Sequence, residues 1–519
     1  MPMPEREILE RLSPLDLAIL ALYLLGVLGM SLAFAWRQRT GNDYFLAGRS
    51  MGAVPLALSI MANQASAVSL VGAPAFVALR EGGGLRWLQY ELAVPLAMLL
   101  LAVILLPALR SVPGASIYAY AEKRFGRATR RALAGSFLLA RGLSLGVILY
   151  ASALVVAEVL GCSVDAALLG VGLFSVAYTS LGGIVADIWS DVVQLVLLWG
   201  GTFVSAFYLL EHAGVGVLSS IPEERAATLM LGAPGSDPFS LWPMLFGGLF
   251  LYLSYYGCDQ SQAQRLLTAR SDSEARRALL LNGLLRFPMV LTYCAFGLLL
   301  AALLRTDSSF AAAMEGRPPD SLVPAFLMSY LPTGLRGLLL AAILAAAMSS
   351  IDSALNSLAA VTLDDVLGID SAKQSVWLGR TASLGWGLFA VVSGMFFART
   401  GAGILELVNM IGSAFYGPVL AVFVLGAIAA GVREASALAG LGAGLASNFA
   451  LAWLAPAVPW LWWNPTGFLV AAMVALAAGA PGFHREKRWQ RRESALLLGA
   501  FAVMVGVLAL LPKIVALLR

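Results

Sequence analysis

Hydroxyl and carboxylate side chains gather within one apolar stretch, where Ser349, Ser350, Asp352 and Ser353 follow a run of alanines. Sodium is a hard cation that prefers oxygen ligands, including the backbone carbonyls that an unwound helix leaves free. Because residues three and four positions apart are neighbours on a helix, Ser349, Asp352 and Ser353 share one face. The stretch is therefore a candidate cation site. Alternatively, the serines bond to carbonyls of their own helix and Asp352 pairs with Arg141.

Other ionisable residues also fall within apolar stretches, where each costs about 2.5 to 3.5 kcal/mol at the centre of a membrane helix. They are therefore expected to face the interior of a bundle, as partners of one another or along a pathway. Counting about 1.5 Å per residue from the loops places Arg141, Asp191 and Asp352 in the same half of the membrane. Glu91 lies in the other half and Arg286 near the middle. The whole set is Glu91, Arg141, Asp187, Asp191, Asp259, Arg286, Asp352 and Glu406.

These charges stand out because the chain is apolar: 60% of its 519 residues are hydrophobic and 12% are charged. In soluble domains about a quarter of residues are charged. A membrane-spanning helix needs about 20 mostly apolar residues, and the apolar runs predict an all-α polytopic membrane protein with about 14 such helices. Their predicted centres lie near residues 25, 66, 97, 145, 172, 197, 249, 290, 350, 386, 415, 445, 474 and 505.

Loop charges predict the orientation, because cytoplasmic loops carry an excess of lysine and arginine. Every second loop is basic. The longest of the other loops, residues 211–239, carries four acidic residues and one arginine. The chain is therefore predicted to lie in the cell inner membrane with the basic loops inside and both termini outside. The basic residues are Arg37, Arg39, Arg49, Arg110, Lys123, Arg124, Arg127, Arg130, Arg131, Arg265, Arg270, Arg276, Arg277, Arg485, Lys487, Arg488, Arg491 and Arg492.

Polar residues interrupt two of the predicted spans. The second span contains Asn63, Gln64, Ser66 and Ser69, and the seventh ends in the polar segment 255–260. Backbone groups left unpaired in lipid cost several kcal/mol each and are tolerated only around a cavity. Paired breaks in two halves of a chain point to an inverted-repeat transporter with its site near the middle of the membrane. The alternative is that small and polar residues merely pack helices together.

Several other functions have little support. An enzyme would need a nucleophile with a base, a metal cluster or a cofactor loop, but the two histidines, His212 and His484, fall in predicted loops and no HExxH motif occurs. We therefore expect no enzymatic activity and no organic cofactor. The cysteines Cys162, Cys258 and Cys294 show no disulfide or metal spacing. A net charge of +4, placed in loops, argues against nucleic acid as a partner and leaves the lipid bilayer and a small solute.

Four blocks of sequence make the chain resemble the sodium:solute symporter family, which includes sodium/glucose, iodide, monocarboxylate and sialic acid transporters. The blocks are Asn42 to Arg49, Gly182 to Gln194, Asp259 to Arg265 and Ser349 to Ser357. The resemblance implies a leucine-transporter-like core of five plus five helices in inverted repeat, with two broken helices. It also implies sodium-coupled symport of a small polar solute into the cell by alternating access, with Na⁺ as the coupling ion.

The resemblance further implies a division of the chain. It consists of an N-terminal extra helix and cytoplasmic loop (1–52), a first repeat (53–210), an extracytoplasmic loop (211–239), a second repeat (240–430) and C-terminal extra helices (431–519).

The resemblance also assigns the sodium ligands. Carbonyls of the broken helix and of a later helix, together with two hydroxyls, form the site that the family shares. By position these are Ala62, Ala65, Ala346, Ser349 and Ser350. A second sodium site, present in some members, maps to Asp191, Ser349, Asp352 and Ser353. Asp352 replaces a serine of the sialic acid transporters, so an extra carboxylate either strengthens cation binding or neutralises Arg141.

Solute contacts map by the same resemblance to Ser69, Glu91, Asp259, Arg286 and Asn409. Ser69 replaces a sugar-binding glutamine, and arginine suits carboxylates, so a sugar or polyol and a small organic anion both remain candidates. Glu91 and Arg286 alternatively form a buried ion pair.

Two further questions stay open at this point. The aromatic residues near the implied solute site either gate it or simply pack the helices; they are Tyr255, Tyr256, Phe415 and Tyr416. A proton-coupled symporter of the same fold, in which Asp191 or Asp352 titrates, is the nearest rival to sodium coupling.

Overall fold

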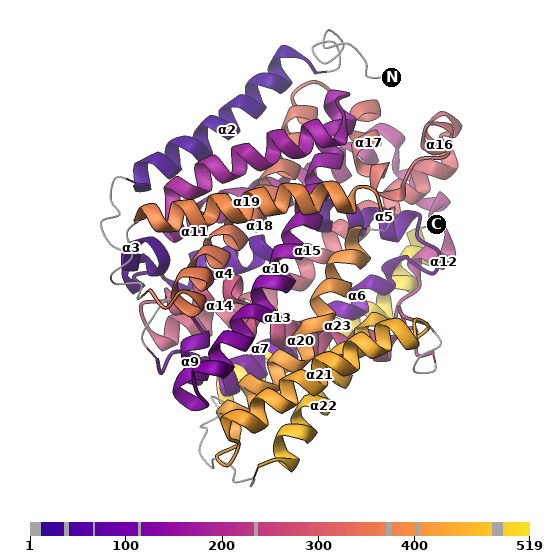
Figure 1. The fold of residues 1–519 in the computed structure, drawn as a ribbon. Coiled ribbons are helices and arrows are strands. Elements are labelled where there is room, and N and C mark those ends of the chain that lie inside the picture. The colour runs from indigo at the N-terminus through magenta and orange to yellow at the C-terminus, as the bar shows by residue number, and fades with distance from the viewer. Residues whose placement is uncertain are drawn as a thin grey trace.

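The computed structural model describes residues 12–35, 41–65, 68–112, 116–232, 237–369, 376–400, 404–479 and 491–518, and Figure 1 shows that this part of the chain is almost entirely helical. Within these ranges, the isolated bridge between Met51 and Ala269 is the one strand-like contact. The long helices are α2 (Pro14–Ala35), α10 (Arg127–Leu160), α11 (Val164–Ala213), α15 (Asp272–Thr306), α18 (Leu335–Val361), α19 (Val376–Phe397), α20 (Ile404–Ile428), α21 (Glu434–Leu454), α22 (Trp463–Ala477) and α23 (Arg491–Leu518).

Shorter helices complete the bundle and its loops. They are α3 (Gly41–Leu46), α4 (Ala53–Gln64), α5 (Ala73–Ala78), α6 (Leu88–Glu91), α7 (Ala93–Leu100), α8 (Leu106–Leu109), α9 (Tyr118–Arg124), α12 (Glu223–Ala226), α13 (Gly248–Cys258), α14 (Gln260–Leu267), α16 (Ser308–Met314) and α17 (Leu322–Tyr330). Helices α6, α7 and α8 follow one another closely, and together they form one apolar span, Leu85–Leu109.

Ten helices of the described residues are long and apolar enough to cross a membrane, and one bent pair makes eleven. The multi-pass architecture is therefore confirmed, but the count of fourteen is not. The remaining predicted centres lie in three weaker elements. Val164–Ala177 is apolar but short, α13 stops at a break, and α19 contains Arg380 together with several serine, threonine and glycine residues.

Both predicted breaks are present. Helix α4 ends at Gln64, Ala65 leaves the helical conformation with φ −81° and ψ 64°, and the chain continues at an angle of 61° into Ser69–Ala78. Ser66 lies outside the described residues. The second break is at Asp259, which is extended with φ −84° and ψ 122° between α13 and α14. Its carboxylate accepts the Ser261 amide at 2.9 Å and so caps α14.

A third irregularity lies inside α11. Gly183 has φ +58° and ψ −171°, a conformation that residues with a side chain rarely adopt, and it divides the helix into two segments. The second segment continues to Ala213, past residue 210, where the first repeat was predicted to end. Only this segment is long enough to count as a span.

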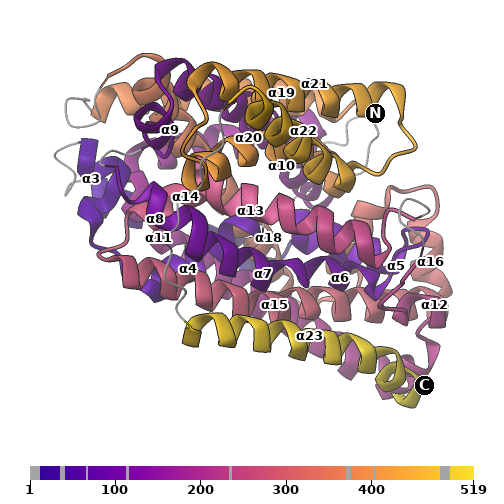
Figure 2. The ribbon, with the colours of Figure 1, turned by 90° about the horizontal axis from the view of Figure 1, so that it is seen from below.

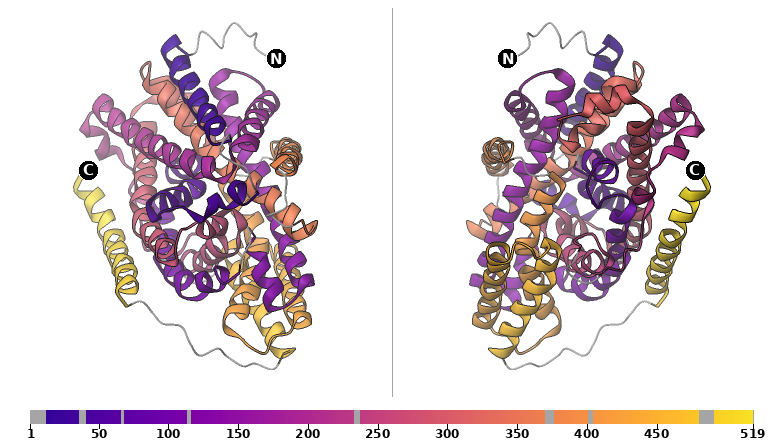
Figure 3. Two further views of the ribbon diagram at one scale, coloured as in Figure 1. Left: turned by 90° about the vertical axis from the view of Figure 1, so that its left-hand side faces the viewer. Right: turned by 90° about the vertical axis from the view of Figure 1, so that its right-hand side faces the viewer.

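Helix α18 lies at the centre of the bundle and is almost completely buried. It packs against α11, α10, α4 and α14, and Figure 2 shows these helices running together through the middle of the molecule. Helices α2, α21 and α23 are largely exposed. Figure 3 shows α23 on the opposite side of the molecule from α21 and α22, where it packs against α7 and α15. The core therefore brings both breaks close to the serine-rich part of α18.

Candidate functional site

The first break meets α18 at Ser350. The Ser350 hydroxyl donates to the Asn63 carbonyl at 2.9 Å, at the C-terminal end of α4. Ala62, Ala65 and Ala346 are buried in the same region. The structure therefore brings a hydroxyl of α18 to the unwound backbone, as the resemblance implied. The assignment of these residues as sodium ligands stays a prediction.

Ser349 is oriented differently from its neighbour. Its hydroxyl donates to Asp191 Oδ1 on α11. Successive residues on a helix are rotated by about 100°, so Ser350 faces α4 while Ser349 faces α11. Ser349 consequently lies between the two predicted sodium sites and contacts the carboxylate of the second one.

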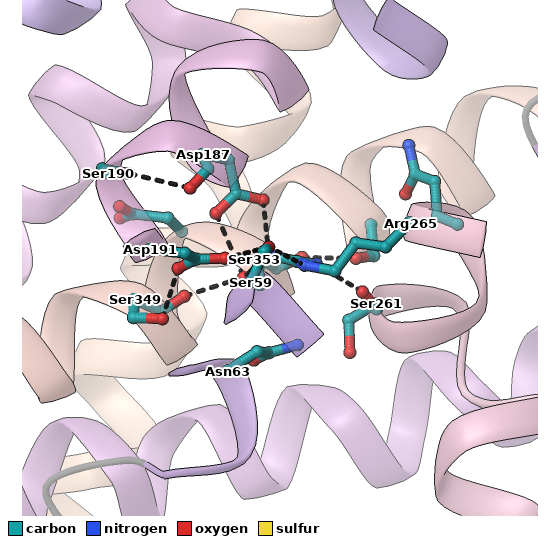
Figure 4. A network of polar contacts seen from close by, with 12 residues as sticks. Ser59, Asn63, Asp187, Ser190, Asp191, Ser261, Arg265, Ser349 and Ser353 are labelled. Carbon is teal, nitrogen blue, oxygen red and sulfur yellow. Dashed lines mark hydrogen bonds and ion pairs between the residues drawn. The ribbon is translucent and has the colours of Figure 1, made fainter. Parts of the chain in front are cut away.

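A buried polar network continues from Asp191, as Figure 4 shows. Asp191 Oδ2 accepts from the Ser59 hydroxyl at 2.5 Å and from Arg265 Nη2 at 2.8 Å. Arg265 Nη2 also lies 2.9 Å from Asp187 Oδ2 and contacts the Ser353 hydroxyl. Arg265 Nε donates to Ser59 at 2.6 Å. One guanidinium thus holds together side chains from α4, α11 and α18.

Arg265 was predicted to belong to a basic cytoplasmic loop, and this prediction is wrong. Its side chain is 1% exposed and lies within α14, which begins at the second break and turns into the bundle. A guanidinium is stable in such surroundings only when carboxylates and hydrogen-bond acceptors satisfy it. The sequence held part of the signal, because Asp187 and Asp191 lie one helical turn apart within an apolar stretch and need a cationic partner, but it does not show which arginine supplies it.

The network carries an excess of negative charge. Two carboxylates, Asp187 and Asp191, face the one guanidinium of Arg265, so the three side chains sum to −1 when all are ionised. Asp352 Oδ1 accepts from the Thr179 hydroxyl at 2.5 Å, while Arg141 donates to the Asn63 side chain at 3.3 Å. Buried charge of one sign is costly without compensation, and a bound cation compensates it. The arrangement therefore suits a cation.

A cavity of about 110 Å³ lies next to this region, between the first break and α10, α13, α15 and α20. Of the predicted solute and gate residues, six line it: Ser69, Glu91, Arg286, Asn409, Tyr255 and Tyr416. Other residues of its wall include Asn63, Gln64, Trp87, Tyr90, Arg141, Ser144, Tyr252, Tyr293 and Ser350.

Three predicted residues do not line this cavity. Asp259 and Phe415 lie beside a smaller, separate cavity, because the Asp259 carboxylate is turned toward the N-terminus of α14. The Tyr256 hydroxyl donates to the Gln64 side chain. Tyr256 thus contacts Gln64, which lines the cavity, and does not line the cavity itself.

Glu91 and Arg286 form the buried ion pair that the sequence left as an alternative to solute binding. Arg286 Nε lies 3.2 Å from Glu91 Oε2, and the two side chains are 6% and 1% exposed. The Tyr252 hydroxyl donates to the other Glu91 oxygen at 3.1 Å. Arg286 Nη1 has no hydrogen-bond partner among the described residues. The pair is therefore neutral as a unit, but it keeps one free donor on the wall of the cavity.

Arg141 is a candidate solute contact that the sequence did not identify. It lines the cavity, its guanidinium carbon lies 6.0 Å from the centre of the Tyr255 ring, and its Nε has no partner in the part of the chain that the structure describes. The sequence assigned Arg141 only as a possible partner of Asp352. With Glu91 and Arg286 cancelling, Arg141 is the remaining charge among the residues that line the cavity, and Asp259, beside the smaller cavity, attracts it electrostatically.

Comparisons with known proteins agree with this geometry. The model of the sodium:solute symporter family matches residues 44–444. The human sodium/iodide cotransporter is 31% identical over 446 residues, which cover 83% of this chain and 68% of the relative. The human sodium-coupled monocarboxylate transporter 1 is 30% identical over 435 residues, covering 81% and 70%. The sodium-dependent multivitamin transporter of Oryctolagus cuniculus is 30% identical, covering 86% and 72%.

Solved structures share the fold. A Na⁺-coupled sialic acid symporter, in a substrate-bound outward-open state, aligns with a TM-score of 0.81 at 22% identity and covers 90% of this chain and 98% of that protein. A nucleobase-cation-symport-1 family transporter in a closed conformation aligns with a TM-score of 0.56 at 14% identity, covering 87% and 98%. At these identities the likeness extends to the fold alone.

Proposed function

The chain belongs to the sodium:solute symporter family, and from this premise we propose that it uses Na⁺ to carry a small organic anion into the cell. Its relatives are transporters, so the chain is a membrane transporter and not an enzyme. The family supports Na⁺ as the coupling ion, whereas no finding favours a proton. The class of solute is the more specific part of the proposal, and it rests on the residues that line the cavity.

The proposal of an anionic solute rests mainly on the position of Arg141 in the cavity wall. A sugar or polyol would use Glu91 as a hydrogen-bond acceptor, but Arg286 and Tyr252 already engage both of its oxygens. Because Glu91 is neutralised, it does not repel an anion, and the remaining charge of the wall is that of Arg141. Arginine binds carboxylates in a planar geometry with strong, charge-assisted hydrogen bonds. Two of the relatives carry anions by their names, iodide and monocarboxylates, which supports the same class.

We further propose that Asn63 couples the cation to the solute. Its carbonyl accepts from Ser350 in the predicted sodium site, and its side-chain oxygen accepts from Arg141 in the cavity. Sodium held by carbonyls at the unwound end of α4 and by Ser350 restrains this residue from one side. The restrained Asn63 then orients the Arg141 guanidinium for the anion, so that the solute binds more tightly after sodium.

The charge of the solute makes the number of sodium ions important. Each elementary charge moved inward gains about 2.3 kcal/mol per 100 mV, which corresponds to about fiftyfold accumulation. One Na⁺ carried with a monoanion moves no net charge, so the membrane potential would contribute nothing. A second Na⁺ at Asp191, Asp352 and Ser353 would restore this contribution. The surplus of negative charge in that network supports a second ion.

The orientation and the division of the chain remain proposals as well. Basic loops on the cytoplasmic side of the inner membrane, with both termini outside, agree with the charge distribution. The two breaks lie within segments 53–210 and 240–430, as two inverted repeats require.

Uptake into proteoliposomes tests the proposed function. Small carboxylates and neutral sugars are offered while sodium and proton gradients are imposed separately, and we expect carboxylate uptake driven by sodium. Arg141→Gln should weaken carboxylate binding about tenfold to a hundredfold, because a hydrogen bond to a charged group contributes about 1.5 to 3 kcal/mol. Arg399→Gln, at an exposed site, is the control. Sugar uptake without carboxylate uptake would reject the anion, and uptake driven only by protons would reject sodium coupling.

A further inference from the structure

A second cavity lies away from the transport site, between the first turns of α4 and α15. It is a groove of about 450 Å³. Its apolar wall includes Val54, which is 58% exposed, together with Leu280 and Leu281. Arg270 and Arg277 stand at its rim. Apolar side chains with an adjacent positive rim are suited to an amphipathic ligand with an anionic end.

The two arginines are only partly neutralised. Arg270 Nη2 and Arg277 Nη1 lie 3.2 and 3.6 Å from the same oxygen, Glu274 Oε1, and both arginine side chains are 63% exposed. The other carboxylate oxygen, Oε2, accepts the Ala53 amide at 2.6 Å. Glu274 is therefore shared between two guanidinium groups and the N-terminus of α4. The cluster keeps a charge of +1.

The groove lies at the level where a membrane surface is expected. Helices α4 and α15 both begin here, at Ala53 and Asp272, and continue into the apolar bundle. Leu280 lies eight residues into α15, which is about 12 Å along the helix axis. The charges and the apolar wall are thus arranged along the direction in which a lipid head group and its acyl chain would extend.

We propose that this groove binds an anionic phospholipid. Its phosphate would contact Arg270 and Arg277, and one acyl chain would lie against Val54, Leu280 and Leu281. Basic pockets between membrane helices bind anionic head groups in this way. A free phosphate would share the head-group contacts but would leave the apolar wall exposed, which favours the lipid. The inference is independent of which solute the chain transports.

Lipid binding to the purified full-length chain tests the proposal. Phosphatidylglycerol or phosphatidylcholine is titrated in a neutral detergent and followed by native mass spectrometry and thermal unfolding. We expect phosphatidylglycerol to bind more tightly, and Arg270→Gln/Arg277→Gln to weaken it about tenfold while phosphatidylcholine binding stays the same. Arg305→Gln/Arg317→Gln is the matched control, because these arginines are also exposed and lie in the ion pairs Arg305–Glu224 and Arg317–Glu158.

Two further measurements separate the lipid from other outcomes. Leu281→Asn keeps both arginines and should weaken phosphatidylglycerol without changing the response to glycerol phosphate. If the double arginine variant does not fold, the single variants Arg270→Gln and Arg277→Gln should each show a smaller loss. Equal binding of phosphatidylglycerol to the rim variants and to the wild type would overturn the proposal. Full competition by glycerol phosphate would also overturn it, in favour of a soluble anion.

Discussion

Two groups of buried charges lie near the middle of this transporter, and they are balanced differently. In the solute cavity, Glu91 and Arg286 form a neutral pair, and Arg141 adds a positive charge. In the network next to Ser349, the carboxylates of Asp187 and Asp191 face the guanidinium of Arg265. A low-dielectric interior does not tolerate uncompensated charge without a partner. On this basis we expect an anion in the cavity and a cation in the network.

The difference also separates the two groups by position. The charged side chains of the cavity come from α6, α10 and α15, whereas the network joins α4, α11, α14 and α18. Asn63 lies between them, with its carbonyl toward Ser350 and its side chain toward Arg141. A substitution in the network should consequently be compensated by added cation, and a substitution in the cavity by added anion. Substitutions in each of the two groups test this relation.

We expect the largest effect from Arg265→Gln. Removal of one partner of a buried ionic group costs about 3 to 5 kcal/mol, because the remaining charges stay buried without compensation. The variant should unfold at a clearly lower temperature, and added sodium should recover more stability than it gives the wild type. Arg265→Lys, which keeps the charge, is the control. A loss of stability that sodium does not recover would argue against a cation in this network.

Glu91→Gln should have the next largest effect, and an anion should restore its stability better than sodium does. The substitution leaves Arg286 without its carboxylate, but the guanidinium faces a cavity, so we expect a loss of about 1 to 3 kcal/mol. Small carboxylates should restore the unfolding temperature, whereas sodium alone should restore less of it. Thermal unfolding with carboxylate salts and with sodium chloride measures both. Rescue by sodium and not by carboxylate would contradict the distinction between the two regions.

The sequence was sufficient for the membrane class and the two breaks. The breaks were predictable because polar residues such as Asn63 and Gln64 within an apolar run leave few alternatives to a cavity. Arg265 was not predictable from charge alone, because a basic residue after an apolar span usually lies in a loop. Only the turn of α14 into the bundle shows that this arginine is buried.

The solute cavity was predicted less completely for a related reason. Glu91 and Arg286 could be assigned to the solute or to each other, and a sequence does not show which contact forms. Arg141 was identified as a buried charge, but its partner could not be chosen. The count of fourteen spans is not confirmed where glycine and polar residues shorten or interrupt helices, as at Gly183 in α11 and Asp259 after α13.

Ser350→Ala should have a smaller effect, limited to the sodium dependence. The variant loses a hydroxyl that reaches the Asn63 carbonyl, and a typical hydrogen bond contributes about 1 kcal/mol. We therefore expect the sodium concentration for half-maximal uptake to rise about fivefold. Ser357→Ala is the matched control on the same helix, because the Ser357 hydroxyl bonds back to the Ser353 carbonyl. An unchanged sodium dependence in Ser350→Ala would reject the assignment of Ser350.

Asp307→Asn should have the smallest effect and supplies a reference outside the membrane-spanning segments. Hydrogen bonds from the Ser309 hydroxyl, the Tyr330 hydroxyl and the Phe310 amide hold the pKa of Asp307 below its ordinary value of 3.8. A depressed pKa means that the ionised carboxylate stabilises the fold above that ordinary value, and that this stabilisation is lost as the pH falls below it. The wild type should therefore lose more stability than Asp307→Asn between pH 6 and about pH 3, measured by thermal unfolding. Asp165→Asn, at an exposed ion pair with Arg399, is the control. An equal acid response of wild type and Asp307→Asn would show that these hydrogen bonds do not favour the ionised form, and buried networks would then be the main source of acid sensitivity.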